Sequence, residues 1–211
     1  MADRKNVKVV IFDCDGVMFD SREANEAYYN RILEEFGKPR MDQRQQEYVH
    51  MNTATQSLAF LFEGDSRLPE ALTFRKQMSY ASFIPMMRME PYLRTLLSKL
   101  SGRYKTAIAT NRSDTMNAVL EEHQLTDCFD LVVSSLDVPS PKPAPDALLK
   151  ILNHFQIDEE GAVYVGDSKI DELTAEAAKV PFIAYKNPQL RADYHVNHFE
   201  ELGAWLFGHG K

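Results

Sequence analysis

Two aspartates, separated by a single residue, lie at the end of an apolar run near the start of the chain. The run VKVVIFDCDGVMFD covers residues 7–20, with Cys14 between Asp13 and Asp15 and Gly16 directly after them. In an extended chain alternate side chains share a side, so both carboxylates are expected in one cleft while Cys14 turns into the core. Carboxylates this close repel one another unless a cation or a proton relieves them. The pattern therefore predicts a site that holds a cation or transfers protons.

Polar residues also follow three later apolar runs. Thr110 and Asn111 stand in AIATNRSD, Lys142 in VPSPKPAPD, and Asp167 and Asp171 in YVGDSKIDE. If the runs are parallel strands, these side chains converge at the carboxyl edge of a sheet, where such sheets bind ligands. Carboxylates with one lysine and one hydroxyl are typical of a site for a divalent cation and a phosphate. Ligation by oxygen alone suits magnesium.

The elements that must position these residues alternate between strand and helix. Strands are expected at 7–12, 105–110, 129–135, 161–166 and 182–185, and helices at 91–100, 113–123, 144–155 and 170–180. A weaker strand and helix are expected within 193–205. This alternation predicts an α/β fold with a parallel sheet covered by helices on both faces.

The alternation is interrupted between the first two strands. Residues 21–37 have helical periodicity, with Ser21 as the expected N-cap and Gly37 as the stop, and 41–64 and 68–84 also read as helices. We therefore expect an α/β core formed by 1–20 and 86–211, and a helical cap formed by 21–85. The methionine-rich stretch IPMMRME, residues 84–90, is the expected hinge between them.

Composition restricts the classes of partner. The 211 residues carry a formal net charge of -7, which disfavours non-specific binding to nucleic acid or to anionic membranes. Cys14 and Cys128 are the two cysteines and form no CxxC pair, so neither zinc nor a disulfide is expected. No signal peptide and no apolar run of about 20 residues is visible. We expect a cytoplasmic protein that acts on a small molecule, and its oligomeric state stays open.

The motifs DCDGV, ATN, KPAPD and GDSKID follow, in this order, the four motifs of the haloacid dehalogenase-like superfamily, which the sequence resembles over nearly its whole length. The helical insertion resembles the cap of the phosphoglycolate phosphatase-like and β-phosphoglucomutase-like branch. This resemblance implies a Rossmann-like core with a helical-bundle cap. It also implies a magnesium-dependent phosphatase that hydrolyses a small phosphorylated metabolite through an aspartyl-phosphate.

The resemblance also implies a role for each motif residue. Asp13 matches the nucleophile, Asp15 the general acid and base, and Lys142 the lysine that pairs with the nucleophile and the phosphoryl charge. Thr110 and Asn111, together with Lys142, match the residues that bind the phosphoryl group. The metal site that it implies consists of Asp13, the backbone carbonyl of Asp15, Asp167 and Asp171.

Other functions stay open on the sequence alone. A sugar-phosphate mutase would use the same catalytic residues, and a non-catalytic binding protein could share the fold. Each polar residue, taken singly, could also be an ordinary strand-end or helix-capping residue. Dehalogenation is disfavoured because the dehalogenases of the family lack the aspartate that matches Asp15. The cap is expected to select the substrate, with these unranked candidates at its turns: Arg22, His50, Asn52, Thr53 and Arg88.

Overall fold

A single parallel sheet forms the centre of the protein, whose residues 4–208 are described by a computed structural model. Its strands, in spatial order, are β5 (Leu131–Val133), β4 (Lys105–Ala109), β1 (Val9–Phe12), β6 (Ala162–Gly166), β7 (Phe182–Tyr185) and β8 (Tyr194–Val196). All four residues of β1 are buried, because this central strand is covered on both faces.

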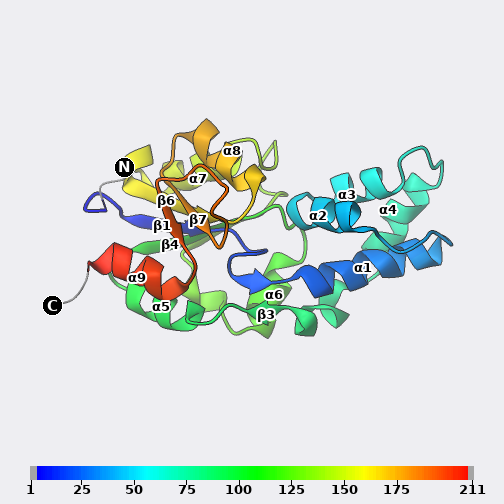
Figure 1. The fold of residues 1–211 in the computed structure, drawn as a ribbon, viewed down its shortest axis with the longest axis horizontal. Helices are drawn as coiled ribbons and strands as arrows, with labels where there is room; N and C mark the ends of the chain where they lie inside the picture. Colours follow the sequence, from blue (N-terminus) through cyan, green and yellow to red (C-terminus); the bar gives the residue numbers. More distant parts are fainter. Residues whose placement is uncertain (1–3, 209–211) are drawn as a thin grey trace.

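Helices cover both faces of the sheet. Figure 1 shows α7 (Asp146–Phe155) and α8 (Lys169–Ala178) on one face, and α5 (Leu93–Leu100) and α9 (Phe199–Phe207) on the other. Val9 and Ile11 belong to the hydrophobic cluster under α7 and α8, whereas Val10 and Phe12 belong to the cluster that contains α5 and α9 residues. The expected Rossmann-like α/β fold is confirmed.

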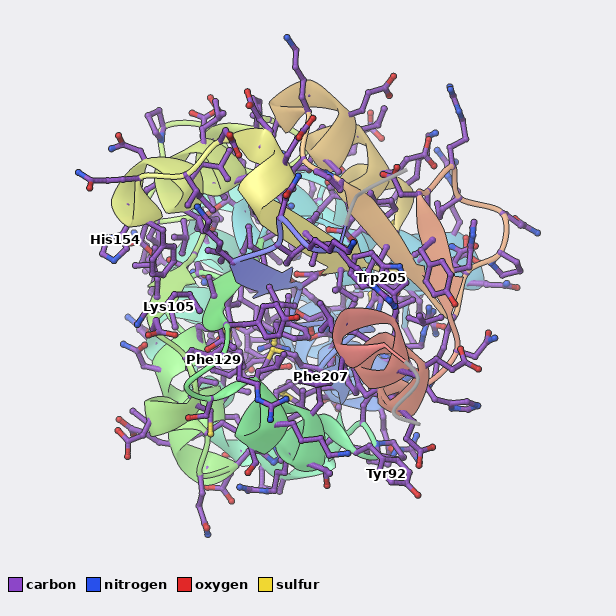
Figure 2. The ribbon with its side chains drawn as sticks, turned by 90° about the vertical axis from the view of Figure 1, so that its left-hand side faces the viewer. Tyr92, Lys105, Phe129, His154, Trp205 and Phe207 are labelled. Atoms are coloured by element: carbon purple, nitrogen blue, oxygen red, sulfur yellow. The ribbon has the colours of Figure 1, made fainter. Side chains whose placement is uncertain are left out.

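A group of helices lies at one end of the sheet, on the right in Figure 1. It comprises α1 (Arg22–Glu35), α2 (Gln43–Met51), α3 (Ala54–Leu61) and α4 (Leu68–Gln77), followed by two 3₁₀ turns, η1 (Tyr80–Ser82) and η2 (Ile84–Met86). We call these helices the cap. Figure 2 views the molecule from the opposite end, where Lys105, the first residue of β4, is labelled. The carboxyl ends of the strands therefore point toward the cap.

Two short strands frame the cap. β2 (Phe19–Asp20) pairs antiparallel with β3 (Arg88–Met89), so the chain segments that enter and leave the cap are held together. The stretch expected to be the hinge thus contains one strand of a two-stranded ribbon. This ribbon supports the division into a core of 1–20 and 86–211 and a cap of 21–85, which stays a proposal. One hydrophobic cluster nevertheless continues from the core into the cap, and includes both Phe12 and Phe62.

Several predicted boundaries differ from the structure. The helix expected over 68–84 ends at Gln77, because Met78 is extended and Ser79 caps the next 3₁₀ turn. The helix expected from Ser113 (α6) covers Met116–Glu122. Ser21 occupies the N-cap position of α1 but makes no capping hydrogen bond, and its hydroxyl donates to the Asp15 carboxylate instead. Among residues 4–208, no helix has the length and apolar character needed to span a lipid bilayer.

Candidate active site

Three neighbouring strands bring the first, second and fourth motifs to one edge of the sheet, and the loop after β5 brings Lys142 there. Phe12 at the end of β1 lies opposite Ile108 of β4 and Val165 of β6. The residues that directly follow these strands are therefore neighbours. Both aspartates of the first motif lie there, with Cys14 fully buried in the hydrophobic cluster between them, as alternation predicts.

Lys142 is a buried cation at the centre of this edge, only 3% exposed. Its Nζ lies 2.8 Å from Asp13 Oδ1 and 2.7 Å from Asp171 Oδ1, and donates to the Tyr164 hydroxyl at 2.9 Å. Burial lowers the lysine pKa, but the charges of Asp13 and Asp171 outweigh burial and raise it above the ordinary value. Lys142 is therefore held as a permanent cation against Asp13.

A cluster of three carboxylates suits a divalent cation. Ligand oxygens of Asp13, Asp167 and Asp171 lie within 4.8 Å of one another. Burial raises the Asp13 pKa to about 7 despite Lys142, and burial together with the charges of Asp171 and Asp13 raises the Asp167 pKa well above its usual range. Both shifts show that negative charge is poorly compensated here. The donor set fits magnesium, which accepts a few carboxylates and completes its shell with water and phosphate.

The three carboxylates are not equally free to bind a cation. Asp171 Oδ1 accepts from Lys142 and Tyr164, and its Oδ2 accepts from the Ser168 backbone at 3.1 Å and hydroxyl at 2.6 Å. Asp13 Oδ1 lies at ion-pair distance from Lys142 but has no aligned hydrogen-bond donor among the described residues. Asp13 and Asp167 are thus the carboxylates with free lone pairs, and Asp171 holds the lysine.

Gly16 makes room for the Asp167 carboxylate. Its φ is +82°, and a Cβ at this position would lie 2.1 Å from Asp167 Oδ2. A side chain here would both strain the backbone and displace the carboxylate. Glycine after the two aspartates is therefore required by the close approach of the Asp167 carboxylate as well as by the turn.

Substituting Gly16 should impair cation binding more than folding. We expect Gly16→Ala to raise the magnesium concentration needed for half-maximal activity at least about tenfold, because Asp167 must move. Gly37→Ala is the matched control, since Gly37 also has a positive φ of +64° but no atom within 4 Å of the added Cβ. Both variants should lose about 1 kcal/mol of stability from backbone strain. An equal magnesium requirement in the two variants would contradict the contact with Asp167.

Asp15 is paired with an arginine that the sequence analysis missed. Arg112 Nε donates to Asp15 Oδ2 at 2.8 Å and Nη2 to Oδ1 at 2.7 Å, and the Ser21 hydroxyl donates to the same carboxylate. Burial raises the Asp15 pKa, but the Arg112 charge outweighs burial and holds it below its usual range. Arg112 also donates to the Tyr80 hydroxyl at 3.2 Å. The sequence signal that could have placed Arg112 in the site was its position two residues after Thr110.

The second motif positions other parts of the site. Thr110 Oγ1 accepts from the Arg112 backbone at 3.1 Å, so its hydroxyl shapes the turn that carries the arginine. Asn111 Oδ1 accepts from the Lys142 backbone at 2.9 Å, and its Nδ2 donates to the carbonyls of Lys142 and Met51, each at 3.1 Å. Asn111 thus connects the loop of the catalytic lysine candidate to the cap.

A cavity of about 50 Å³ lies between the carboxylates and the cap. Of the cap residues considered from the sequence, His50 and Asn52 line it, whereas Arg22, Thr53 and Arg88 do not. The cap lining that the sequence analysis missed consists chiefly of Asn25, Tyr28, Tyr29, Arg75 and Tyr80. These come from α1, α4 and the turn after it, whose orientation no local sequence pattern reveals.

The parallel sheet thus carries a buried Asp–Lys pair at its carboxyl edge, beside a cluster of carboxylates. The profile of the family described as haloacid dehalogenase-like hydrolase matches residues 10–185. The chain therefore belongs to this family, as its motifs predicted.

Curated relatives in the family are phosphatases. The phosphoglycolate phosphatase of Nitrosospira multiformis is 29% identical over 184 residues, which cover 82% of this chain and 80% of the relative. The phosphorylated carbohydrates phosphatase of Thermotoga maritima is 27% identical and covers 82% of both chains. The expectation of an enzyme of the phosphoric monoester hydrolase type is supported by these relatives.

Solved structures of the family have the same fold. A haloacid dehalogenase-superfamily hydrolase of subfamily IA from Geobacter sulfurreducens is 42% identical, with a TM-score of 0.78 over 95% of this chain and 97% of that one. The β-phosphoglucomutase of Clostridium difficile has a TM-score of 0.81 over 93% of both chains but is only 18% identical, so it shares the fold alone.

Proposed function

We propose that this hydrolase is a magnesium-dependent phosphatase that hydrolyses a small phosphorylated metabolite through an aspartyl-phosphate on Asp13. The observation that carries the proposal is the 2.8 Å approach of Lys142 Nζ to Asp13 Oδ1, beside ligand oxygens of Asp13, Asp167 and Asp171 that lie within 4.8 Å of one another. The names of the phosphoglycolate phosphatase relatives make phosphoglycolate the first substrate to test.

In this proposal Asp13 attacks phosphorus, and Lys142 offsets the charge of the nucleophile and of the transferring phosphoryl group. A magnesium ion held by Asp13, Asp167 and the Asp15 backbone carbonyl would neutralise the phosphate oxygens. Asp171 fixes the lysine through its 2.7 Å contact. Thr110 and Asn111 shape the loops that receive the phosphoryl group, and Asn111 ties the lysine loop in place.

Asp15 is the proposed general acid and base. Arg112 and Ser21 favour its carboxylate form, which suits activation of the water that cleaves the aspartyl-phosphate. Protonating the leaving alcohol is the opposite task and requires a protonated Asp15. In the proposed cycle Arg112 therefore loosens its two-point contact when the substrate occupies the cavity.

Metal removal tests the function directly. With p-nitrophenyl phosphate and magnesium we expect release of p-nitrophenol, which falls at least about a hundredfold with excess EDTA, because the anionic nucleophile then repels the anionic phosphate. Excess magnesium should restore the rate. Undiminished hydrolysis after exhaustive chelation would contradict the metal-dependent mechanism.

A mutase is the second candidate, because it would use the same Asp13, Asp15, Lys142 and Asp167 and the same fold as the β-phosphoglucomutase neighbour. A sugar 1-phosphate distinguishes the two. A phosphatase releases inorganic phosphate, whereas a mutase yields the sugar 6-phosphate.

We also propose a cytoplasmic location, in keeping with Cys14 and Cys128 both being free thiols. The proposed partner is the small phosphate ester itself, without nucleic acid or membrane.

A further inference from the structure

Arg75 of α4 has an unusual position for an arginine. It lines the same cavity as Asp13 and Arg112, and its side chain is only 10% exposed. Its Nη2 donates to Ser113 Oγ at 3.0 Å and to Asp114 Oδ1 at 2.8 Å. Its Nε, however, is buried and has no acceptor among residues 4–208. The guanidinium also interacts with the Tyr28 hydroxyl, whose pKa it lowers against the larger effect of burial. A buried donor without a partner is disfavoured, so the Nε of Arg75 is available to an acceptor that enters the cavity.

The charge of Arg75 is also the least compensated of the cations in the cavity. Lys142 and Arg112 pair with Asp13, Asp171 and Asp15, whose side chains are at most 12% exposed. Arg75 pairs with Asp114, which is 55% exposed, so water screens that contact. An anion that entered the cavity would therefore be attracted most strongly to Arg75, whose charge no buried carboxylate neutralises.

A second nitrogen in this cavity also lacks a partner. His50 Nε2, from α2 of the cap, is buried and has no hydrogen-bond partner among the described residues. Arg75 and His50 thus leave unpaired nitrogens on the cap side of the cavity, across from the carboxylate cluster. The cavity of about 50 Å³ is small, which favours a short acidic alcohol over a larger one.

We propose that Arg75 is a specificity-determining residue that binds a carboxylate on the alcohol part of the substrate. This inference rests on the proposed phosphatase function and assigns its substrate class: phosphate monoesters of small hydroxy acids. The phosphoryl group is held by the core at Lys142, and the carboxylate is held by the cap at Arg75.

Two esters of similar size test the assignment. Phosphoglycolate carries a carboxylate where ethyl phosphate carries a methyl group. Arg75→Gln should raise the KM for phosphoglycolate about tenfold, as expected for loss of a charge-assisted contact, and should change kcat/KM for ethyl phosphate by less than about twofold. Arg75→Lys should recover part of the affinity. Arg67→Gln is the control, because Arg67 stands at the start of the same helix, is 50% exposed and pairs with Asp65.

The Asp114→Asn variant distinguishes substrate binding by Arg75 from a purely structural role of that residue. If Arg75 only holds the cap against the core, Asp114→Asn should reproduce Arg75→Gln and both esters should suffer equally, which would overturn the proposal. If Arg75 binds the substrate, Asp114→Asn should keep or increase the preference for phosphoglycolate, because the arginine loses a competing carboxylate.

Binding without turnover separates this proposal from the proposed function. In an Asp13→Asn background, calorimetry should show at least about tenfold weaker binding of phosphoglycolate after Arg75→Gln, with ethyl phosphate unchanged. That result would support the role of Arg75 even if the wild type hydrolysed no ester. Equal binding of phosphoglycolate with and without Arg75 would overturn it.

Discussion

Replacing Asp13 by Asn should reduce kcat with phosphate monoesters by about 10⁴-fold or more, because the amide cannot form the aspartyl-phosphate. The substitution keeps the shape of the side chain and leaves Lys142 its partner Asp171. Steady-state phosphate release measures the loss, and mass spectrometry must exclude deamidation back to Asp. Wild-type-like hydrolysis by an intact amide would refute the role of Asp13 as nucleophile.

The stability of the same variant shows whether the loss is chemical or structural. Burial raises the Asp13 pKa to about 7, so the folded state favours the protonated side chain. The stability that this proton contributes is present below about pH 4 and is lost as the pH rises through 7. At pH 8 in EDTA, Asp13→Asn should therefore unfold at the same temperature as the wild type or higher. Magnesium should raise the unfolding temperature of the wild type more than that of the variant.

Lys142→Met should abolish activity and also destabilise the protein. The lysine lies between Asp13 and Asp171, and its removal leaves two buried carboxylates without a cation. Breaking a buried pair in this way costs about 3–5 kcal/mol, which corresponds to about 6–20 °C in unfolding temperature for a chain of this size. Lys105→Met is the control, because that lysine is 58% exposed and its pair with Asp130 contributes little.

A double variant separates the two effects of Lys142. Asp171→Asn removes one of the stranded charges while its remaining oxygen can still accept from Ser168. We therefore expect Lys142→Met with Asp171→Asn to recover much of the unfolding temperature and none of the activity. Additive losses of stability in the double variant would show that the two side chains are not coupled.

The sheet and the motif residues could be predicted because their signals are local. The apolar run at β1 can be buried on both faces only in the middle of a parallel sheet, and β1 is its third strand in spatial order. Parallel strands bring their carboxyl ends to one edge, so Asp13, Lys142 and Asp167 were expected together before any coordinates. Their roles in catalysis stay proposals that the variants above test.

The missed residues depend on contacts that the sequence does not encode locally. Arg112 meets Asp15 across a separation of 97 residues, and alone it resembles an exposed arginine after a strand. Arg75 belongs to a cap helix with little buried surface, and whether it faces water or the cavity depends on how the cap sits on the core. At Ser21 two possible partners compete for one hydroxyl. It donates to the buried Asp15 carboxylate and does not cap the N-terminus of α1.

The ribbon of β2 and β3 restricts how the cap can move relative to the core. Ladder hydrogen bonds between Phe19–Asp20 and Arg88–Met89 prevent the two connections from sliding past each other. Any motion of the cap relative to the core is therefore expected to pivot about this ribbon. Under the proposed function, entry of the phosphate ester and exit of its alcohol would require the same pivoting motion, so a change that stiffens the ribbon should slow both steps.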